Sequence, residues 1–293
     1  MEYTQITYEV HEGIATVTLD RPESRNGYTI RMADEAAHAL RAAIADEDVR
    51  VLVLTGAGED FCVGADLSGG GLGVTEADDP APAASSPWSE PATRVTRLLF
   101  GSGKPVIAAV RGAAVGVGST MILPADFRIA AHDSRFGFVF SRRGIYPEGG
   151  STWFLPRLVG MGRAMDWMIS GRLIGAEEAL TAGLVSALYK PADVLDQAYL
   201  LARDLIARTA PVSTAVIRQA LYRMSPLASP EPAFALDSRL IASCAQSADA
   251  VEGVVSFLER RPPAFTGSVG KDQPDFLPWR DPDRIDPLEG EDL

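Results

Sequence analysis

Two short apolar segments, each followed at once by a glycine-rich turn, restrict the possible folds of this 293-residue chain more than any other feature. Residues 49–54 show no alternation of polar and apolar side chains and lead into Gly56 and Gly58, and residues 105–110 lead into Gly112. Strands covered by helices on both faces have this pattern, which is typical of a parallel sheet. The sequence therefore predicts an α/β fold whose ligand-binding loops follow the carboxyl ends of parallel strands.

Strand and helix patterns alternate along the first part of the chain. Period-two and β-rich runs predict strands, whereas apolar spacing of three to four residues predicts helices. The expected elements are a hairpin over residues 6–20, a helix over 29–45, a strand over 127–131 and one continuous helix over about 152–170. Repeated strand-then-helix units of this kind are typical of α/β folds.

Composition divides the chain into three parts. Residues 1–192 form the expected core, with an insertion at about 68–92 that is rich in Gly, Pro, Ser and Ala and is expected to be a surface flap. From residue 193 to 267 the pattern is wholly helical, with helices expected over 194–208, 212–223 and 231–260, the last broken only by its own small residues. Residues 268–293 are rich in Pro and Asp, lack apolar periodicity and are expected to be an acidic tail.

Charge and cysteine content exclude several classes of protein. The chain has 27 Lys and Arg residues against 39 Asp and Glu residues, a net charge of −12, which argues against nucleic-acid binding because phosphate neutralisation requires clustered positive charge. No window approaches about 18 uninterrupted apolar residues, so no membrane partner is expected. Two cysteines, Cys62 and Cys244, are too few for a disulfide framework, and a reducing cytoplasm is the expected location.

Several segments resemble known site motifs but lack a required residue. Residues 101–104 (GSGK) lack the first glycine and the final Ser or Thr of a phosphate loop. Residues 56–58 (GAG) are followed by Phe61 where a dinucleotide fingerprint has a small residue, and residues 149–153 have Trp153 in place of the second glycine of a nucleophile elbow. The three histidines show no spacing typical of metal ligands, so no metal site is expected.

The turns after the two buried strands have a composition that suits an anionic ligand. Residues 56–67 and 112–119 consist largely of small residues, which allow a ligand to approach the backbone closely. Their N–H groups could together form an oxyanion hole, and the second turn leads into a predicted helix whose first amides favour negative charge. The alternative is that the glycines only turn the chain and allow the helix to pack.

The order of these motifs resembles that of the crotonase superfamily, the enoyl-CoA hydratase/isomerase family, over about residues 5–267. The motifs that carry the resemblance are FCVGADL, KPVIAAVRGAAVGVGS, SRRGIYPEGGSTWFLPRLVG and EGVVSFLERRPPAF. It implies a crotonase-like spiral of ββα units, a helical C-terminal trimerisation region, and a homotrimer or dimer of trimers. It also implies an acyl-CoA thioester as the small-molecule substrate, with coenzyme A as part of that substrate and no tightly bound cofactor.

Site residues follow from the resemblance by their position in the motifs. The thioester oxygen is implied to accept hydrogen bonds from the N–H groups of Ala65 and Val117. The implied contacts of CoA are Val63, Ala65 and Leu67 beside the adenine, Arg21 and Arg25 near the phosphates, and Phe257 and Arg260 closing the site.

The chain departs from the family where its hydratases carry two catalytic glutamates. Thr120 and Phe140 occupy those places, and neither can act as a carboxylate acid or base. Glu148 lies where a number of family members, including some double-bond isomerases, carry an acidic catalytic residue. One carboxylate is enough to move a proton between two carbons of a dienolate. The alternative is that Glu148 belongs to the start of the helix that follows it.

Three functions are therefore weighed. The leading hypothesis is an acyl-CoA enzyme that is more isomerase-like than hydratase, with Glu148 as the proton shuttle. The second is a hydratase or acyl-CoA hydrolase that works through Glu148 and an ordered water, with assistance from Thr120. The third is a non-catalytic acyl-CoA-binding protein. The family suggests fatty-acid metabolism, but the acyl group is left open by the sequence.

Overall fold

The computed structural model describes residues 1–71, 73, 88–245 and 247–279. The chain forms two compact units, Met1–Arg203 and Asp204–Leu293. Most of the expected flap at 68–92 and the end of the expected tail at 268–293 lie outside the described residues. None of the described helices is long and apolar enough to cross a membrane.

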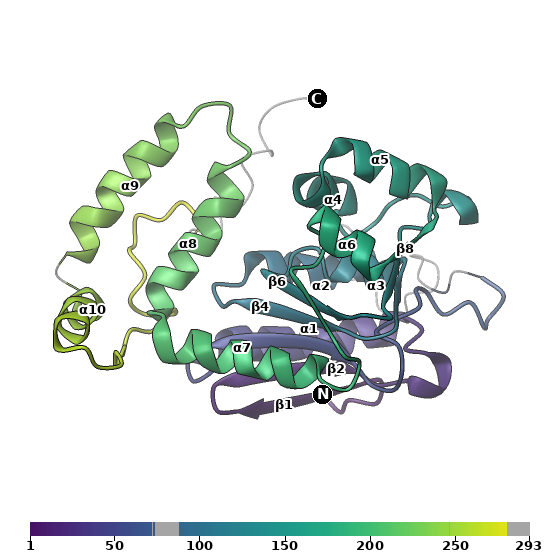
Figure 1. Ribbon diagram of the computed structural model, residues 1–293, viewed down its shortest axis with the longest axis horizontal. Coiled ribbons are helices and arrows are strands. Elements are labelled where there is room, and N and C mark those ends of the chain that lie inside the picture. The colour runs from purple at the N-terminus through teal and green to yellow at the C-terminus, as the bar shows by residue number, and fades with distance from the viewer. Residues whose placement is uncertain (72, 74–87, 246, 280–293) are drawn as a thin grey trace. The chain divides into compact units, whose positions relative to one another are not determined.

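The first unit is built on a six-stranded sheet with the strand order β1-β2-β3-β4-β6-β9 (Figure 1). Its strands are β1 (Ile6–His11), β2 (Ile14–Leu19), β3 (Val51–Gly56), β4 (Val106–Val110), β6 (Phe127–Ala131) and β9 (Ala187–Tyr189). β1 and β2 form the predicted hairpin, and every other neighbouring pair is parallel. All residues of β4 and all but the last of β3 are buried, as their uninterrupted apolar sequences predict.

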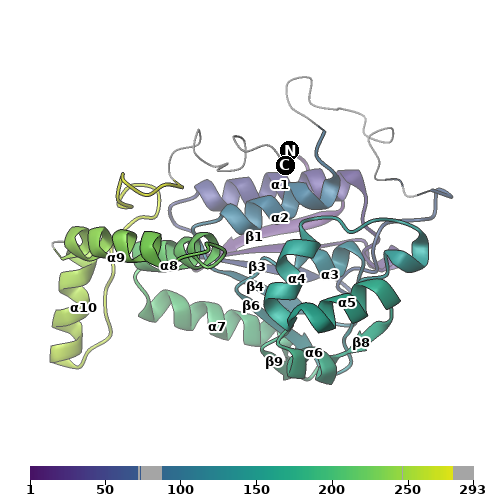
Figure 2. The same cartoon turned by 90° about the horizontal axis from the view of Figure 1, so that it is seen from above.

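Helices α1 (Ile30–Ala45) and α2 (Pro91–Gly101) lie side by side over one face of this sheet (Figure 2). The Thr29 hydroxyl caps α1 by accepting a hydrogen bond of 3.0 Å from the N–H of Met32. At the other end of α1, the buried Lys104 ammonium donates to the carbonyl of Ala43 at 2.7 Å. Lys104 therefore closes a helix and does not serve a phosphate loop, in agreement with the sequence analysis.

A second, three-stranded sheet has the order β5-β7-β8, with β5 (Ala113–Val115), β7 (Arg135–Gly137) and β8 (Leu173–Gly175). β5 follows β4 directly, and β7 follows β6, so each long strand continues into a short strand of the second sheet before a helix begins. The helices of this region are α3 (Val117–Met121), α4 (Ser151–Val159), α5 (Met161–Ser170) and α6 (Ala176–Ala182), with short 3-10 turns η1 (Pro22–Ser24) and η3 (Ser141–Arg143). This order is the predicted succession of ββα units.

The continuous helix predicted over residues 152–170 is wrong, because the chain forms α4 and α5 instead. Gly160 separates them with φ +81° and ψ 155°, a conformation outside the helical region that glycine adopts without steric cost. Pro156 in the last turn of α4 also weakens continuation of the helix.

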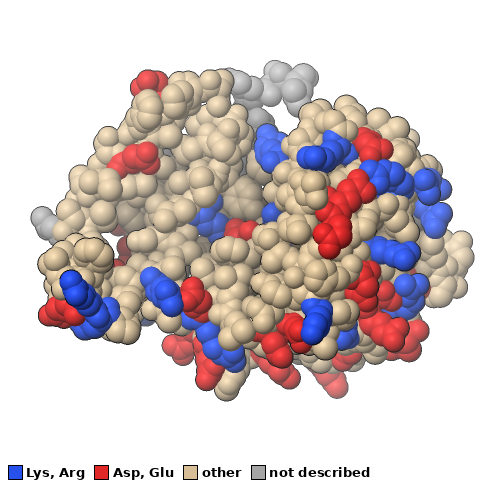
Figure 3. Space-filling model, in the orientation of Figure 1, with Lys and Arg blue, Asp and Glu red and all other residues tan. Residues whose placement is uncertain are grey.

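Charged side chains on the first unit are mixed rather than separated by sign (Figure 3). Arg172, for example, bonds to Asp166 at 2.6 Å and also pairs with Glu178. On the face shown, such pairs place acidic groups among the basic side chains, which does not favour a polyanion such as nucleic acid on that face.

The second unit contains the end of α7 (Val194–Arg208), then α8 (Pro211–Met224), α9 (Glu231–Cys244) and α10 (Ala248–Glu259). The helix predicted over residues 231–260 is therefore divided in two. Ser247 starts the second part, since its hydroxyl accepts a hydrogen bond of 3.1 Å from the N–H of Ala250. Large apolar side chains are exposed along this unit: Ile217, Leu221, Phe234, Ile241, Val251, Val254, Phe257 and Leu258.

Candidate active site

The turns that follow β3 and β4 lie against each other. The N–H of Cys62 donates to the carbonyl of Ala113, and the N–H of Val115 donates to the carbonyl of Cys62, both at 2.9 Å. A Cβ on Gly116 would lie 3.6 Å from the Cα of Gly64. The residues after these two glycines, Ala65 and Val117, are therefore brought to neighbouring positions from segments that are far apart in the sequence.

The N–H groups of Ala65 and Val117 donate to no other group in the part of the chain that the structure describes. Ala65 is half-buried and is held from both sides, because the N–H of Tyr28 donates to the carbonyl of Gly64 at 2.8 Å and the N–H of Asp66 donates to the carbonyl of Tyr28 at 2.9 Å. Val117 is the first residue of α3, where a backbone N–H has no partner within the helix. Two N–H groups without a partner, on turns that are bonded to each other, are compatible with the predicted binding of one oxygen, and this role stays a prediction.

Glu148 lies in the loop before α4, with both carboxylate oxygens buried. Neither oxygen has a hydrogen-bond partner among the described residues, and the same is true of the buried hydroxyl of Thr120. The next residue, Gly149, packs on α3 and α2: with φ +59°, a Cβ there would lie 2.6 Å from Cγ2 of Thr120 and 3.4 Å from Cβ of Ala92. The loop is thus fixed against both helices by a glycine that no other residue can replace without strain.

The carboxylate of Glu148 does not cap α4, which was the alternative role considered for this residue. The carbonyl oxygen of Glu148 accepts hydrogen bonds from the N–H of Ser151 at 3.0 Å and from its hydroxyl at 2.7 Å, whereas the side chain makes no capping bond to α4. A buried carboxylate without partners is costly unless it is protonated or serves a ligand.

The pKa of Glu148 is raised to about 8, chiefly by burial and next by the nearby negative charge of Glu90, while the Thr120 hydroxyl acts in the opposite direction. At neutral pH the carboxyl is therefore mostly protonated but close to its titration point. A group with a pKa near the working pH can both accept and deliver a proton, which is the property required of a single shuttle. Such shifts are enriched at catalytic sites.

The other two places singled out in the sequence are apolar or neutral. Thr120 is fully buried in α3, and Phe140, just before η3, has an exposed fraction of 2%. Neither residue supplies an acid or a base. Among the described residues, Glu148 is the carboxyl group whose buried oxygens have no hydrogen-bond partner.

The predicted CoA contacts of the first unit lie around the turn that holds Ala65. Nη1 of Arg21 donates to the carboxylate of Asp66 at 2.9 Å, and Nε of Arg25 donates to that of Asp60 at 2.6 Å. The pKa of Asp66 is lowered to about 2, first by Ser68 and then by Arg21. Asp66 therefore holds the Arg21 side chain in place.

The remaining predicted contacts differ in their exposure. Val63 is half-buried, Leu67 is exposed, and the Arg25 side chain is 64% exposed. Phe257, with 80% exposure, and Arg260, the left-handed residue that ends α10, belong to the second unit. The CoA contacts of all seven residues stay predictions.

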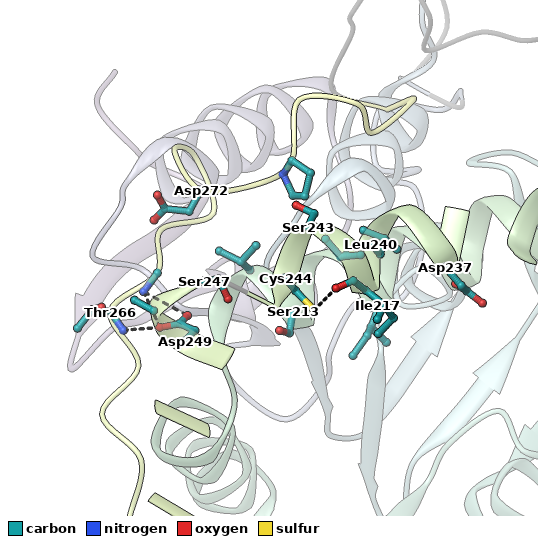
Figure 4. Close-up of a pocket in the computed structure, with 16 residues that line it drawn as sticks. Ser213, Ile217, Asp237, Leu240, Ser243, Cys244, Ser247, Asp249, Thr266 and Asp272 are labelled. Carbon is teal, nitrogen blue, oxygen red and sulfur yellow. Dashed lines mark hydrogen bonds between the residues drawn. The ribbon is translucent and has the colours of Figure 1, made fainter. Parts of the chain in front are cut away.

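A cavity of about 860 Å³ lies within the C-terminal unit, between α8, α9 and the segment around residues 266–274 (Figure 4). Its wall combines apolar side chains with hydroxyl groups such as Ser213 and Ser243. The carboxylate of Asp249 accepts hydrogen bonds from the N–H groups of Thr266 at 2.9 Å and Gly267 at 3.1 Å. None of the residues predicted for catalysis or CoA binding lines this cavity.

Sequence reasoning missed Glu90, which lies against the loop that carries Glu148. Oε1 of Glu90 accepts a hydrogen bond of 2.8 Å from the N–H of Gly149. The Glu-Pro pair at residues 90–91 could have indicated the start of a helix, because an acidic residue followed by Pro suits the first helical turn. No local pattern indicates a contact with a residue 59 positions away.

Comparison with known proteins agrees with this architecture. Residues 9–268 match the enoyl-CoA hydratase/isomerase family. A probable enoyl-CoA hydratase from Rhodobacter capsulatus is 39% identical over 271 residues, which cover 91% of this chain and all of that protein. The 1,2-epoxyphenylacetyl-CoA isomerase of Escherichia coli is 35% identical over 262 residues, covering 89% of this chain and 98% of that protein.

Solved structures give the same result for the fold. The crystal structure of a probable enoyl-CoA hydratase/isomerase from Mycobacterium abscessus superposes with a TM-score of 0.80 and 33% sequence identity, and covers 90% of this chain and all of that chain. The protein belongs to the enoyl-CoA hydratase/isomerase family, the crotonase superfamily, and is an acyl-CoA enzyme of that family.

Proposed function

We propose that this enzyme moves a carbon–carbon double bond within an acyl-CoA thioester, with Glu148 as the group that carries the proton. The observation that supports this most directly is the buried carboxyl group of Glu148, whose oxygens have no partner among the described residues and whose pKa is raised to about 8. One such group meets the requirement of an isomerase, whereas hydration by the two-carboxylate route needs a second. Thr120 and Phe140 supply none.

The proposed reaction begins with the thioester oxygen between the N–H groups of Ala65 and Val117. The ionised form of Glu148 takes a proton from C2 of a 3-enoyl thioester or, in the reverse direction, from C4 of a 2-enoyl thioester. The electrons of the broken C–H bond spread into a dienolate whose negative oxygen accepts both N–H bonds. Glu148 then delivers a proton to the other carbon, so the double bond moves and no atom is gained or lost. Exchange of the carboxyl proton with solvent before delivery brings deuterium into the product in heavy water.

A second candidate function rests on Thr120. Its buried hydroxyl has no hydrogen-bond partner among the described residues, like the Glu148 oxygens close to it. These groups together could hold and activate a water molecule, which would make the enzyme a hydratase or an acyl-CoA hydrolase. Several of the relatives are named enoyl-CoA hydratases, and one is named an isomerase. A non-catalytic acyl-CoA-binding role is the third candidate.

We also infer that CoA contacts Val63, Ala65 and Leu67 with its adenine, approaches Arg21 and Arg25 with its phosphates, and is enclosed by Phe257 and Arg260. The exposed apolar side chains of α8–α10 support a homotrimer or a dimer of trimers, because single proteins seldom expose a large group of such side chains. Sedimentation analysis of the native protein tests the assembly: three or six chains are expected, and a monomer would contradict it.

The reaction is tested by mass spectrometry of products in heavy water. Matched 2-enoyl-CoA and 3-enoyl-CoA substrates are incubated with the native enzyme, with Glu148→Gln and with Glu9→Gln, a control at an exposed position on β1. Migration of the double bond with deuterium uptake is expected in the native enzyme and the control and is lost in Glu148→Gln.

Other outcomes select the other candidates. Addition of one water to the substrate would replace isomerisation with hydration, and release of free CoA would indicate hydrolysis. Binding of thioesters without turnover across a panel of acyl groups would support the non-catalytic role. Undiminished turnover in Glu148→Gln would contradict both catalytic proposals.

A further inference from the structure

Glu90 connects the start of α2 to the loop that carries Glu148. Its two oxygens accept hydrogen bonds from the N–H groups of Ala92 and Thr93, both at 2.7 Å, and from the Thr93 hydroxyl. These bonds make Glu90 the N-cap of α2 and fix the position of its carboxylate. The N–H of Gly149, in the loop that carries Glu148, donates a hydrogen bond of 2.8 Å to this fixed carboxylate.

This bond is not required for capping α2, because the helix N–H groups already have their acceptor in the same carboxylate. It does restrict the backbone of Gly149. The left-handed conformation of Gly149 and its close packing on Thr120 further limit the conformations that the loop can adopt. Glu148 is the neighbouring residue, so the position of its carboxyl group depends on where Gly149 is held.

Two titratable groups near Glu148, Cys62 and Tyr28, are neutral at physiological pH. The pKa of Cys62 is raised to about 12, mainly by burial, and that of the buried Tyr28 is raised well above 10.0. The Tyr28 hydroxyl donates to the carbonyl of Pro91 at 3.1 Å. Arg94 on α2 is paired with Asp34 at 2.7 Å. The two described groups that shift the pKa of Glu148 are Glu90 and Thr120, and of these Glu90 carries a charge.

We propose that Glu90 is a positioning residue for Glu148: its carboxylate holds the main chain of Gly149 and places a fixed negative charge beside the Glu148 carboxyl. This inference rests on the proposed proton-shuttle function for its catalytic consequence, although the contact itself does not. Glu90 is not assigned to proton transfer, since its bonds within the described structure are to the backbone N–H groups of Ala92, Thr93 and Gly149 and to the Thr93 hydroxyl.

Two substitutions separate the effect of the Glu90 charge from the effect of its hydrogen bond to Gly149. Glu90→Gln removes the charge but keeps one oxygen for the N–H groups of Thr93 and Gly149. Glu90→Asp keeps the charge and is a preferred N-cap residue, but its shorter side chain does not extend to Gly149. Asp34→Asn is the matched control, because it removes a carboxylate that pairs with α2 and makes no hydrogen bond to the loop at residues 148–150 in the described structure.

The first measurement is independent of turnover. The carboxyl band of protonated Glu148, assigned by its loss in Glu148→Gln, is titrated by infrared difference spectroscopy. Removing a like charge should lower the midpoint by roughly one pH unit in Glu90→Gln. The midpoint should still lie above the ordinary glutamate range because burial is the larger cause. Asp34→Asn should titrate as the native enzyme does.

The second measurement uses the reaction. Glu90→Asp is expected to lower kcat roughly tenfold or more, with little change in KM, since loss of the Gly149 bond misplaces the proton carrier without touching the CoA contacts. Glu90→Gln should retain most of its kcat at pH values above its new midpoint.

The outcomes distinguish this inference from the function it rests on. An unchanged infrared midpoint in Glu90→Gln overturns the electrostatic part, and an unchanged kcat in Glu90→Asp overturns the positioning part. If Glu148→Gln is fully active while the infrared midpoint still falls in Glu90→Gln, the contact is established and the proposed shuttle is wrong. Should Glu90→Asp fail to fold, Glu90→Gln still decides the electrostatic part. Glu90→Ser, a preferred N-cap residue with a side chain too short for Gly149, then replaces Glu90→Asp in the kcat measurement that decides the positioning part.

Discussion

Replacing Glu148 with Gln should remove a penalty that the native protein suffers as the pH rises. In the unfolded chain this carboxyl ionises at about its usual value of 4.5, whereas in the folded protein its pKa is raised to about 8, chiefly by burial. Between these values the folded state holds a proton that the unfolded state has released. Stability therefore falls with rising pH over this range and levels off above the folded pKa.

The magnitude follows from the difference between the two values. At about 1.36 kcal/mol per pH unit, the penalty is about 3 kcal/mol at pH 7 and about 5 kcal/mol at pH 9. Relaxation of the protein around the carboxylate reduces it, so about 5 kcal/mol is an upper limit. The neutral amide of Gln has no such dependence. Compared with the native protein, Glu148→Gln should gain stability steadily between pH 5 and pH 9.

The assay is urea unfolding at pH 5, 7 and 9, followed by fluorescence of the four tryptophans at one fixed protein concentration. At each pH, the unfolding free energy of the native protein is subtracted from that of the variant, and the change of this difference with pH is the quantity tested. Any cost of burying the amide is the same at every pH and therefore cancels. Glu9→Gln, at an exposed position, serves as the control. A difference between Glu148→Gln and the native protein that stays constant from pH 5 to pH 9 would refute the reasoning.

Three further predictions concern catalysis. Val117→Pro deletes one proposed oxyanion donor at a helix position that accepts proline, and kcat should fall about 100- to 1000-fold while calorimetry still detects thioester binding. Gly149→Ala forces a Cβ to within 2.6 Å of Thr120 Cγ2, so kcat and the thermal unfolding midpoint should both decrease; native values of both would contradict the packing argument. Finally, kcat/KM should rise with pH with a midpoint near the Glu148 pKa of about 8, because only the ionised carboxylate accepts a proton, and a flat profile from pH 6 to pH 9 would oppose this role.

Local sequence was enough to predict most of the secondary structure of this protein. The strand β4 is a continuous apolar run, β3 is apolar over residues 51–54, and α1 follows a capping threonine with regular apolar spacing. These features depend on side chains within one turn or one strand, which the sequence shows directly. The resemblance of the ordered motifs to a known family added the succession of ββα units, which matches the observed strand order.

Breaks within helices were harder to predict than helices themselves. Apolar spacing continues through Gly160 and through the residues before Ala248, yet the chain turns at both places. Both breaks depend on backbone conformation, which periodicity does not report, although the glycine at position 160 is compatible with a break.

The sequence by itself determined which groups this protein has for chemistry: one carboxyl group at residue 148, glycine-rich turns after two strands, and no carboxylate at residues 120 and 140. The tertiary structure decided how these groups act. It brings Gly64 against Gly116, binds Gly149 to Glu90, and removes the Glu148 oxygens from solvent, which raises the pKa of the carboxyl group. The physical reason is that burial and electrostatic coupling depend on distances between segments many residues apart, and only packing sets those distances.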